Sequence, residues 1–218
     1  MEIEILNYKG EKINKKFIFN DKYLIKPHKY SIYLDIKRCL FSKRHGNSKT
    51  KVKKEITGST RKIQKQKGTG NSRKGSIKNP LFRGGARIFG PVKRNYKFKL
   101  NKNVKKLSQL SIINEKLKNN KIIILENFNI DNPKTKKIIN LIKSLNKSKS
   151  LNFLKKKILI VTYNINKNLY LSCRNIPQIN TLNFKEINSY NLLYYYYLIF
   201  IEDSLKYFLK KFDKIIKK

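Results

Sequence analysis

The chain has 218 residues, enough for one domain of ordinary size and a sizeable extension. It carries 52 Lys and Arg against 13 Asp and Glu, a net charge of +39. Repulsion among so many positive side chains disfavours a compact state unless a polyanion neutralises them. This balance argues against a lone metabolic enzyme and for a nucleic-acid partner. The longest unbroken apolar run, residues 192–201, is shorter than the roughly 18 residues of a membrane span, so we expect a buried strand there at most, and no membrane partner.

The amino-terminal part predicts two regular elements. Residues 1–6 alternate enough in polarity for a short strand, and residues 30–41 place apolar side chains at helical spacing. The first residues carry acids at positions 2 and 4 and have no basic stretch followed by an apolar core. We therefore expect neither a secretory signal nor a transit peptide. Cys39 and Cys173, with the two histidines, lack the spacing of a zinc site. We therefore expect no disulfide, metal or cofactor.

Apolar periodicity stops after Phe41 and returns near Leu100. A stretch of this length without periodicity is unusual inside a compact domain. We interpret residues 43–93 as a long, extended, basic loop, disordered alone and ordered by a polyanion.

The composition of this stretch differs from that of the rest of the chain. Lys outnumbers Arg and Ala occurs once, which is typical of a very AT-rich genome, so part of the positive charge reflects codon drift. Yet residues 43–105 hold eight of the nine glycines, six of the eight arginines and the single alanine, Ala86, with one acid, Glu55. Glycine allows close backbone approach and Arg grips phosphate with a planar fork. The clustering therefore predicts intimate contact with nucleic acid.

Strands and helices alternate in the carboxyl-terminal half, which predicts parallel β-α-β units with a sheet covered on both faces. The expected fold class is α/β, a mostly parallel sheet flanked by helices, with residues 1–42 and 94–218 forming the globular domain and the long extended basic loop inserted after the first helix. The expected helices are residues 103–117, 134–145 and 203–217, and the expected strands are residues 121–128, 157–163, 179–184 and 195–201.

Motifs for catalysis or nucleotide binding fail on their chemistry. Gly70 and Gly75 have the spacing of a phosphate-binding loop, but Ser76 stands where that motif needs Lys, and no apolar strand precedes it. The dinucleotide fingerprint fails because Arg73 stands where its last glycine belongs. The acids and histidines form no paired-acid or nucleophile–base spacing, so we expect no catalytic residue and no enzyme.

The tyrosine run at residues 194–197 has two interpretations. It could form a platform on which nucleic-acid bases stack. The apolar surroundings favour the other interpretation, a strand that enters the last helix with alternate rings buried.

Residues 58–91 read GSTRKIQKQKGTGNSRKGSIKNPLFRGGARIFGP. This closely resembles the signature of the fourth protein of the large ribosomal subunit, the universal L-four family of bacterial and organellar type, with its QKGTG core, GG turn and hydrophobic-FGP ending. Similar matches follow at residues 101–110, 132–136, 173–176 and 187–193, so the resemblance covers the chain from about Lys53 onward.

The resemblance implies that the basic loop contacts large-subunit ribosomal RNA and that its tip narrows the polypeptide exit tunnel. Relatives carry Pro-Trp where this chain has Ile63-Gln64, which removes an aromatic ring near the tip, and often a third Gly at the position of Ala86. The residues implied to bind RNA are Arg61, Lys62, Lys65, Lys67, Arg73, Lys74, Lys78, Arg83, Arg87, Lys93 and Arg94. The implied tip residues are Gln64, Gln66, Lys67, Gly68, Thr69 and Gly70.

The function implied is that of a structural constituent of the large subunit, which binds ribosomal RNA, supports assembly and lines the exit tunnel. Its implied partners are that RNA, neighbouring ribosomal proteins including the other tunnel-constriction protein, and the nascent polypeptide. The AT bias suggests a plastid ribosome of the apicomplexan kind, or else a mitochondrion or the cytoplasm of a reduced bacterial endosymbiont. Two alternatives stay open. An RNA-processing enzyme would show converging carboxylates at the strand carboxyl ends, and a non-ribosomal RNA chaperone would show no preference among RNAs.

Overall fold

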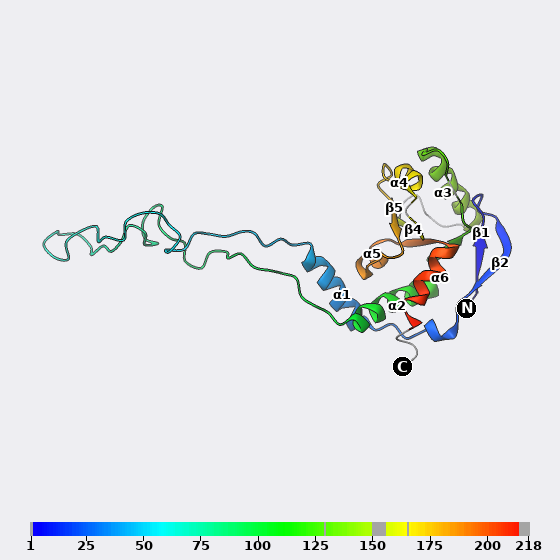
Figure 1. Cartoon of the computed structure of the whole chain (residues 1–218), viewed down its shortest axis with the longest axis horizontal. Coiled ribbons are helices and arrows are strands. Elements are labelled where there is room, and N and C mark those ends of the chain that lie inside the picture. The colour runs from blue at the N-terminus through cyan, green and yellow to red at the C-terminus, as the bar shows by residue number, and fades with distance from the viewer. Residues whose placement is uncertain (1, 129, 150–155, 165, 214–218) are drawn as a thin grey trace. The chain divides into compact units, whose positions relative to one another are not determined.

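The computed structural model describes residues 2–128, 130–149, 156–164 and 166–213. By its internal contacts the chain divides into two units, one formed by Met1–Phe41 with Phe98–Lys218 and the other by Ser42–Lys97. The first unit holds all the strands and helices described below (Figure 1). Within the described residues, no helix combines the length and apolar character that a membrane span requires.

The first unit is built on a six-stranded sheet with the order β2-β1-β3-β6-β4-β5. Only β2 runs antiparallel, against β1, and the other pairs are parallel, which confirms the expected α/β class. The central strands read IIIL, YLIFI and ILIVT, continuous apolar runs that suit a sheet buried on both faces. The strands are β1 Glu2–Leu6, β2 Lys12–Ile18, β3 Ile122–Leu125, β4 Ile158–Thr162, β5 Ile179–Asn183 and β6 Tyr197–Ile201.

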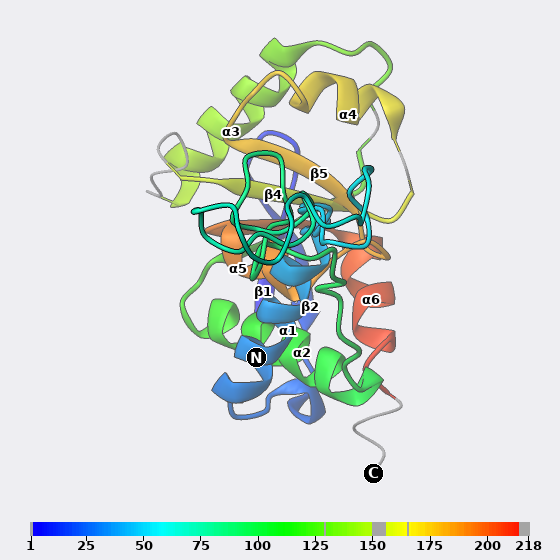
Figure 2. The ribbon, with the colours of Figure 1, turned by 90° about the vertical axis from the view of Figure 1, so that its left-hand side faces the viewer.

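Helices cover both faces of this sheet (Figure 2). On one face, α2, α5 and α6 pack side chains such as Ile113, Leu192 and Phe208 against the strands, and on the other α3 and α4 contribute Leu141 and Leu169. The α-helices are α1 Lys29–Ser42, α2 Lys102–Lys118, α3 Thr135–Lys149, α4 Lys167–Cys173, α5 Ser189–Tyr194 and α6 Glu202–Lys210, and Asp21–Tyr23 forms a short 3-10 turn.

Several boundaries differ from the sequence-based expectation. The strand expected at residues 121–128 ends at Leu125, and the helix expected at 203–217 ends at Lys210, with residues 214–217 outside the described part. The run at residues 192–201 is not one strand, because α5 continues to Tyr194 before β6 begins at Tyr197. Consequently the rings do not alternate, and only Tyr197 of the four tyrosines is buried.

Besides the short 3-10 turn, three elements were not predicted at all: β2, α4 and α5. The strand β2 reads KINKKFI, in which lysines interrupt the apolar pattern, as suits an edge strand that must not pair with another chain. The two helices have only seven and six residues, too few to display a helical period in the sequence. Tertiary packing of residues such as Leu169 and Leu192, both buried, stabilises them instead.

A buried polar network ties α1 to α2 and α5. The Asp35 side chain is fully buried, and one of its oxygens accepts a hydrogen bond from Arg38 Nε at 2.7 Å. The other oxygen accepts from Ser189 Oγ at 2.6 Å, and Ser189 Oγ in turn accepts from Ser108 Oγ at 3.0 Å. Buried charge is tolerated where it is paired and hydrogen-bonded, so this network fixes the position of α1.

A second buried charge, Lys116, joins α2 to the junction between α5 and β6. Its Nζ donates to the carbonyl oxygens of Tyr195 at 2.5 Å and Tyr196 at 3.1 Å, and burial lowers its pKa to about 8. Between that value and the ordinary lysine pKa, the unfolded chain binds one more proton than the folded chain, so the free energy of unfolding rises with pH.

We expect this lysine to add on the order of 2 kcal/mol of stability between pH 8 and pH 10.5, measured by urea unfolding across that window. Because tyrosines and other lysines also titrate there, the comparison is with Lys116→Met, in which this contribution is lost. Stability profiles of the two proteins that run parallel with pH would contradict the assignment.

Candidate nucleic-acid interface

The second unit, Ser42–Lys97, is a long loop. Its outgoing and returning segments, which we call the two legs, run side by side in opposite directions. The legs are joined by backbone hydrogen bonds from Arg87 to Lys51 at 3.1 Å and from Ile63 to Gly75 at 3.3 Å. The members of each pair lie equally far along the chain from residue 69. The legs therefore turn back around Thr69, among the residues that the family resemblance implies for the tip.

Near the ends of the unit the legs approach closely around Tyr96. The guanidinium carbons of Arg44 and Arg94 lie 4.1 Å and 4.5 Å from the centre of this ring, and Arg94 lowers the pKa of the phenol. Gly46 has a φ of +64°, and a Cβ there would lie 2.2 Å from the Arg94 carbonyl oxygen. Glycine is required at this position because both the backbone conformation and the contact exclude a side chain.

A compact turn at residues 79–86 sits on the returning leg. Phe82 donates its N–H to the Asn79 carbonyl, and Ala86 donates to the Lys78 carbonyl at 3.0 Å. A Cβ on Gly85 would lie 2.0 Å from the Asn79 carbonyl oxygen, which explains the glycine. Ala86 is buried inside the turn, so the turn forms without a third glycine.

The predicted RNA-binding side chains are displayed along this unit. Lys74 and Lys78 are partly buried and the other nine are exposed. The acid of this region, Glu55, forms an ion pair with Lys49. The field over the unit is therefore strongly positive, with exposed arginines and lysines on both legs.

At the predicted tip, Gly68 and Gly70 both have positive φ, at +82° and +63°, with open space where a Cβ would project. Their role is thus conformational, because they let the chain turn back. Lys62 donates a hydrogen bond to the side chain of Gln66, and Gln64 is partly buried, while Lys67 and Thr69 are exposed.

Sequence reasoning missed two exposed apolar side chains in this unit. Leu81 is 90% exposed, and Phe89 is fully exposed with a left-handed φ of 55°. A bulky residue in that conformation is strained, a feature that is common at functional positions. The hydrophobic-FGP ending was the signal that could have identified Phe89, because an aromatic ring has no packing partner in a segment without a core.

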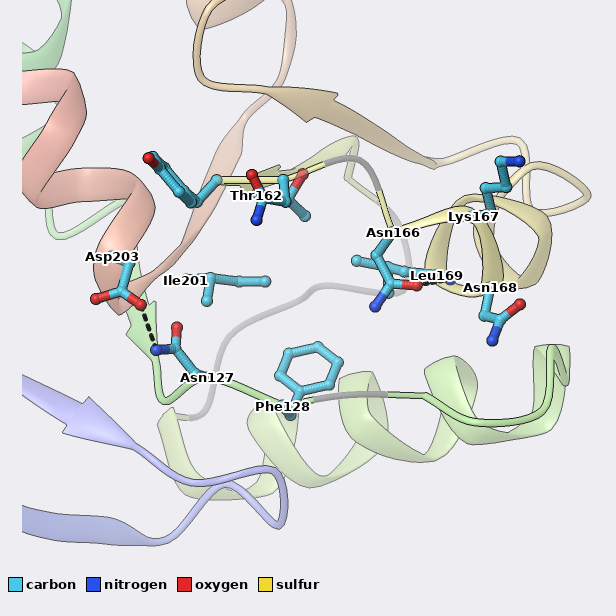
Figure 3. A pocket seen from close by; sticks show the side chains of 11 residues that line it. Asn127, Phe128, Thr162, Asn166, Lys167, Asn168, Leu169, Ile201 and Asp203 are labelled. Carbon is cyan, nitrogen blue, oxygen red and sulfur yellow. Dashed lines mark hydrogen bonds between the residues drawn. The ribbon is translucent and has the colours of Figure 1, made fainter.

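The enzyme alternative can be examined at the carboxyl ends of β3, β4 and β6, where open α/β sheets bind ligands. A cavity of about 540 Å³ lies there (Figure 3). Among the described residues that line it, Asp203 is the single carboxylate, and it accepts a hydrogen bond from Asn127. Asparagines such as Asn166 supply most other polar groups. The converging carboxylates that an RNA-processing enzyme would need are not among these lining residues.

Comparisons with known proteins match this chain to ribosomal proteins over almost its whole length. The family model described as the ribosomal protein L4/L1 family matches residues 18–211. Similar proteins include the large ribosomal subunit protein uL4 of Flavobacterium johnsoniae, 44% identical over 94% of this chain and 96% of the relative, and that of Porphyromonas gingivalis, also 44% identical with the same coverage. The uL4 protein of Amoebophilus asiaticus is 41% identical over 98% of this chain and 99% of its own length.

Proposed function

This chain belongs to the ribosomal protein L4/L1 family, and on that premise we propose that it is a structural constituent of the large ribosomal subunit and not an enzyme. The proposal rests on the unit Ser42–Lys97, a cationic loop of two antiparallel segments that has no hydrophobic core of its own. Such a segment gains little from folding alone and much from neutralisation by a polyanion. We propose that residues 43–93 bind large-subunit ribosomal RNA and support its assembly.

The chemistry of the contacts follows from the side chains. The exposed arginines, among them Arg61, Arg73 and Arg83, suit bidentate contacts with phosphates and stacking on bases, whereas lysines supply point charges. RNA is recognised largely through shape, phosphates and unpaired nucleotides, to which an extended segment without a hydrophobic core can conform. The exposed Phe89 ring and the exposed Leu81 side chain would contact bases or a neighbouring ribosomal protein.

Sedimentation tests this function directly. Native protein carrying an epitope tag should co-migrate with large subunits in a gradient run at high salt, because many contacts within an assembled particle resist the salt that removes loosely bound cations. A non-ribosomal RNA chaperone or an RNA-processing enzyme would leave the particles under these conditions. Recovery of the protein only at the top of the gradient would overturn the proposal.

We further propose that the tip, Gln64 to Gly70, lines the polypeptide exit tunnel beside the other tunnel-constriction protein and touches the nascent chain. Two observations support this. The antiparallel pairing of the two legs places the turn of the chain at Thr69, and the QKGTG core resembles that of the family. With Ile63-Gln64 in place of Pro-Trp, this tip would meet the nascent chain with amides and an ammonium rather than with an indole ring.

Reversing the charge at the tip should change passage through the tunnel more than assembly. For Lys67→Glu we expect a normal yield of large subunits and about twofold slower translation of a strongly basic nascent segment, because the new carboxylate attracts it. Ribosome profiles and timed synthesis in a purified translation system measure the two effects. An unchanged elongation rate on that segment, with normal assembly, would show that Lys67 lies away from the tunnel.

Composition and relatives both bear on the compartment. Composition alone suggests a plastid, with a mitochondrion or a reduced bacterial endosymbiont as alternatives. The relatives at 41% to 44% identity are bacterial proteins matched over almost their whole length, which supports the endosymbiont cytoplasm. We therefore propose a bacterial-type ribosome of an AT-rich endosymbiont, and in situ hybridisation to its ribosomal RNA alongside immunolabelling of the protein distinguishes this from a plastid.

A further inference from the structure

The tyrosine run at residues 194–197 lies at the amino end of the sheet, between α5 and β6. Tyr194 is 46% exposed, Tyr195 and Tyr196 are partly buried, and Tyr197 is buried. Tyr190, one helical turn before Tyr194, stacks on it with ring centres 5.6 Å apart and an interplanar angle of 19°. The exposed ring of Tyr194 is thus supported by a second ring.

The parallel register places lysines beside these rings. Lys121 and Lys157 immediately precede β3 and β4, the two strands that flank β6. The Lys157 carbonyl accepts hydrogen bonds from the N–H groups of Tyr196 at 2.9 Å and Tyr197 at 3.2 Å, and the Lys121 carbonyl accepts from Leu198 at 3.0 Å. The starts of three adjacent strands are therefore held together by backbone bonds.

The lysine side chains lie against the tyrosine rings. The Nζ of Lys157 is 3.8 Å from the centre of the Tyr194 ring, and those of Lys156 and Lys121 are 3.6 Å and 4.3 Å from the centre of the Tyr196 ring. The neighbouring Lys156 and Lys121 also lower the pKa of the Tyr196 phenol. We call Tyr190, Tyr194, Tyr196, Lys121, Lys156 and Lys157 the tyrosine–lysine patch.

We propose that the tyrosine–lysine patch binds unpaired RNA, with a base stacked on Tyr194 and the adjacent phosphates held by Lys121, Lys156 and Lys157. The inference rests on the proposed function only in that the partner is RNA. It assigns a second contact site, separate from the unit Ser42–Lys97, which we call the basic unit. Interleaved rings and cations are the arrangement by which proteins hold single strands. Lys157 also donates a hydrogen bond to the Tyr194 hydroxyl, at an exposed position. An ammonium over an exposed ring is a weak interaction, whereas a stacked base is a stronger one, so we expect Lys157 to exchange both contacts for a phosphate as the base arrives.

The chain contains no tryptophan, so a single substitution gives a local probe. In Tyr194→Trp the indole keeps the stacking surface and is the sole source of tryptophan fluorescence. An oligouridine of about 12 nucleotides should quench that fluorescence by about half, and a duplex RNA of the same length should quench it far less because its bases are already stacked. Equal quenching by single-stranded and duplex RNA would overturn the stacking model.

Two matched controls make the measurement specific to the patch. In Tyr170→Trp the probe is moved to α4, where the native ring is 50% exposed, and the oligouridine should leave its fluorescence unchanged. In the Tyr194→Trp background, changing Lys121 and Lys157 to Ala should raise the concentration for half-maximal quenching about tenfold, whereas changing Lys136 and Lys137 to Ala should not. Equal effects of the two lysine pairs would contradict the patch.

Anisotropy of a labelled oligouridine, measured on the same samples, separates this inference from the proposed function. Binding to the full chain without quenching of Trp introduced at Tyr194 would refute the patch and leave RNA binding by the basic unit intact. Absence of any binding would refute both. Circular dichroism that matches the parent protein confirms that each variant is folded.

Discussion

Replacing Asp35 with Ala should lower the free energy of unfolding of the chain by about 3–5 kcal/mol, the usual cost of removing one member of a buried ion pair. The Asp35 carboxylate has no exposed surface and accepts from both Arg38 and Ser189. Its removal leaves a guanidinium and a hydroxyl without their acceptor. It also takes away the anion that opposes the lowering of the Lys211 pKa by burial and by Lys106. Urea unfolding followed by circular dichroism measures the loss.

The matched control is Asp131→Ala, which makes the same change in net charge at an exposed position. In a chain of +39 the removal of any acid adds to the self-repulsion, so the control isolates that general effect, which we expect to stay below about 1 kcal/mol. If the two variants lost the same stability, the network around Asp35 would contribute nothing beyond its charge.

Asp35 also illustrates which contacts the sequence pattern does not predict. The helix around it was predicted from the spacing of apolar residues such as Ile32 and Ile36, and α1 confirms that prediction. Nothing near Asp35 in the chain indicates that its partner is Ser189, which is 154 positions away. Local patterns report the burial of a face, but pairing between distant polar groups depends on the completed fold.

The same limit applies to the candidate interface. Glycine and arginine retained against the AT bias identified the basic stretch, because those residues have properties that lysine and asparagine lack. The structure shows that two of these glycines are required for packing within the unit itself. Gly46 and Gly90 permit close contact between the two legs, with Arg94 and with Thr50, rather than close approach to a partner. Only the paired legs reveal this, since the contacting residues are far apart in the sequence.

Reversing the charge of Arg83 and Arg87 together should weaken binding to large-subunit ribosomal RNA about 100-fold and sharply reduce incorporation into subunits. Arg83 lies in the 79–86 turn, Arg87 directly follows it, and both side chains are exposed. Arg87 joins the legs through its backbone N–H, which a side-chain change preserves. Two phosphate contacts would be lost and two repulsions gained, about 2.7 kcal/mol in sum. The slope of log affinity against log salt should fall by about 2. Filter binding across a salt series and the yield of subunits in gradients measure these effects.

A control with the same change in net charge decides whether place or total charge matters. Changing Lys136 and Lys137 on α3 to Glu also lowers the formal charge by four, at exposed positions of the first unit. Because part of the positive charge reflects codon drift outside the basic unit, this control should bind nearly as well as the parent chain. Equal losses in the two double variants would mean that RNA responds to the overall field alone, and the clustering of arginine in the basic unit would then have no separate role in binding.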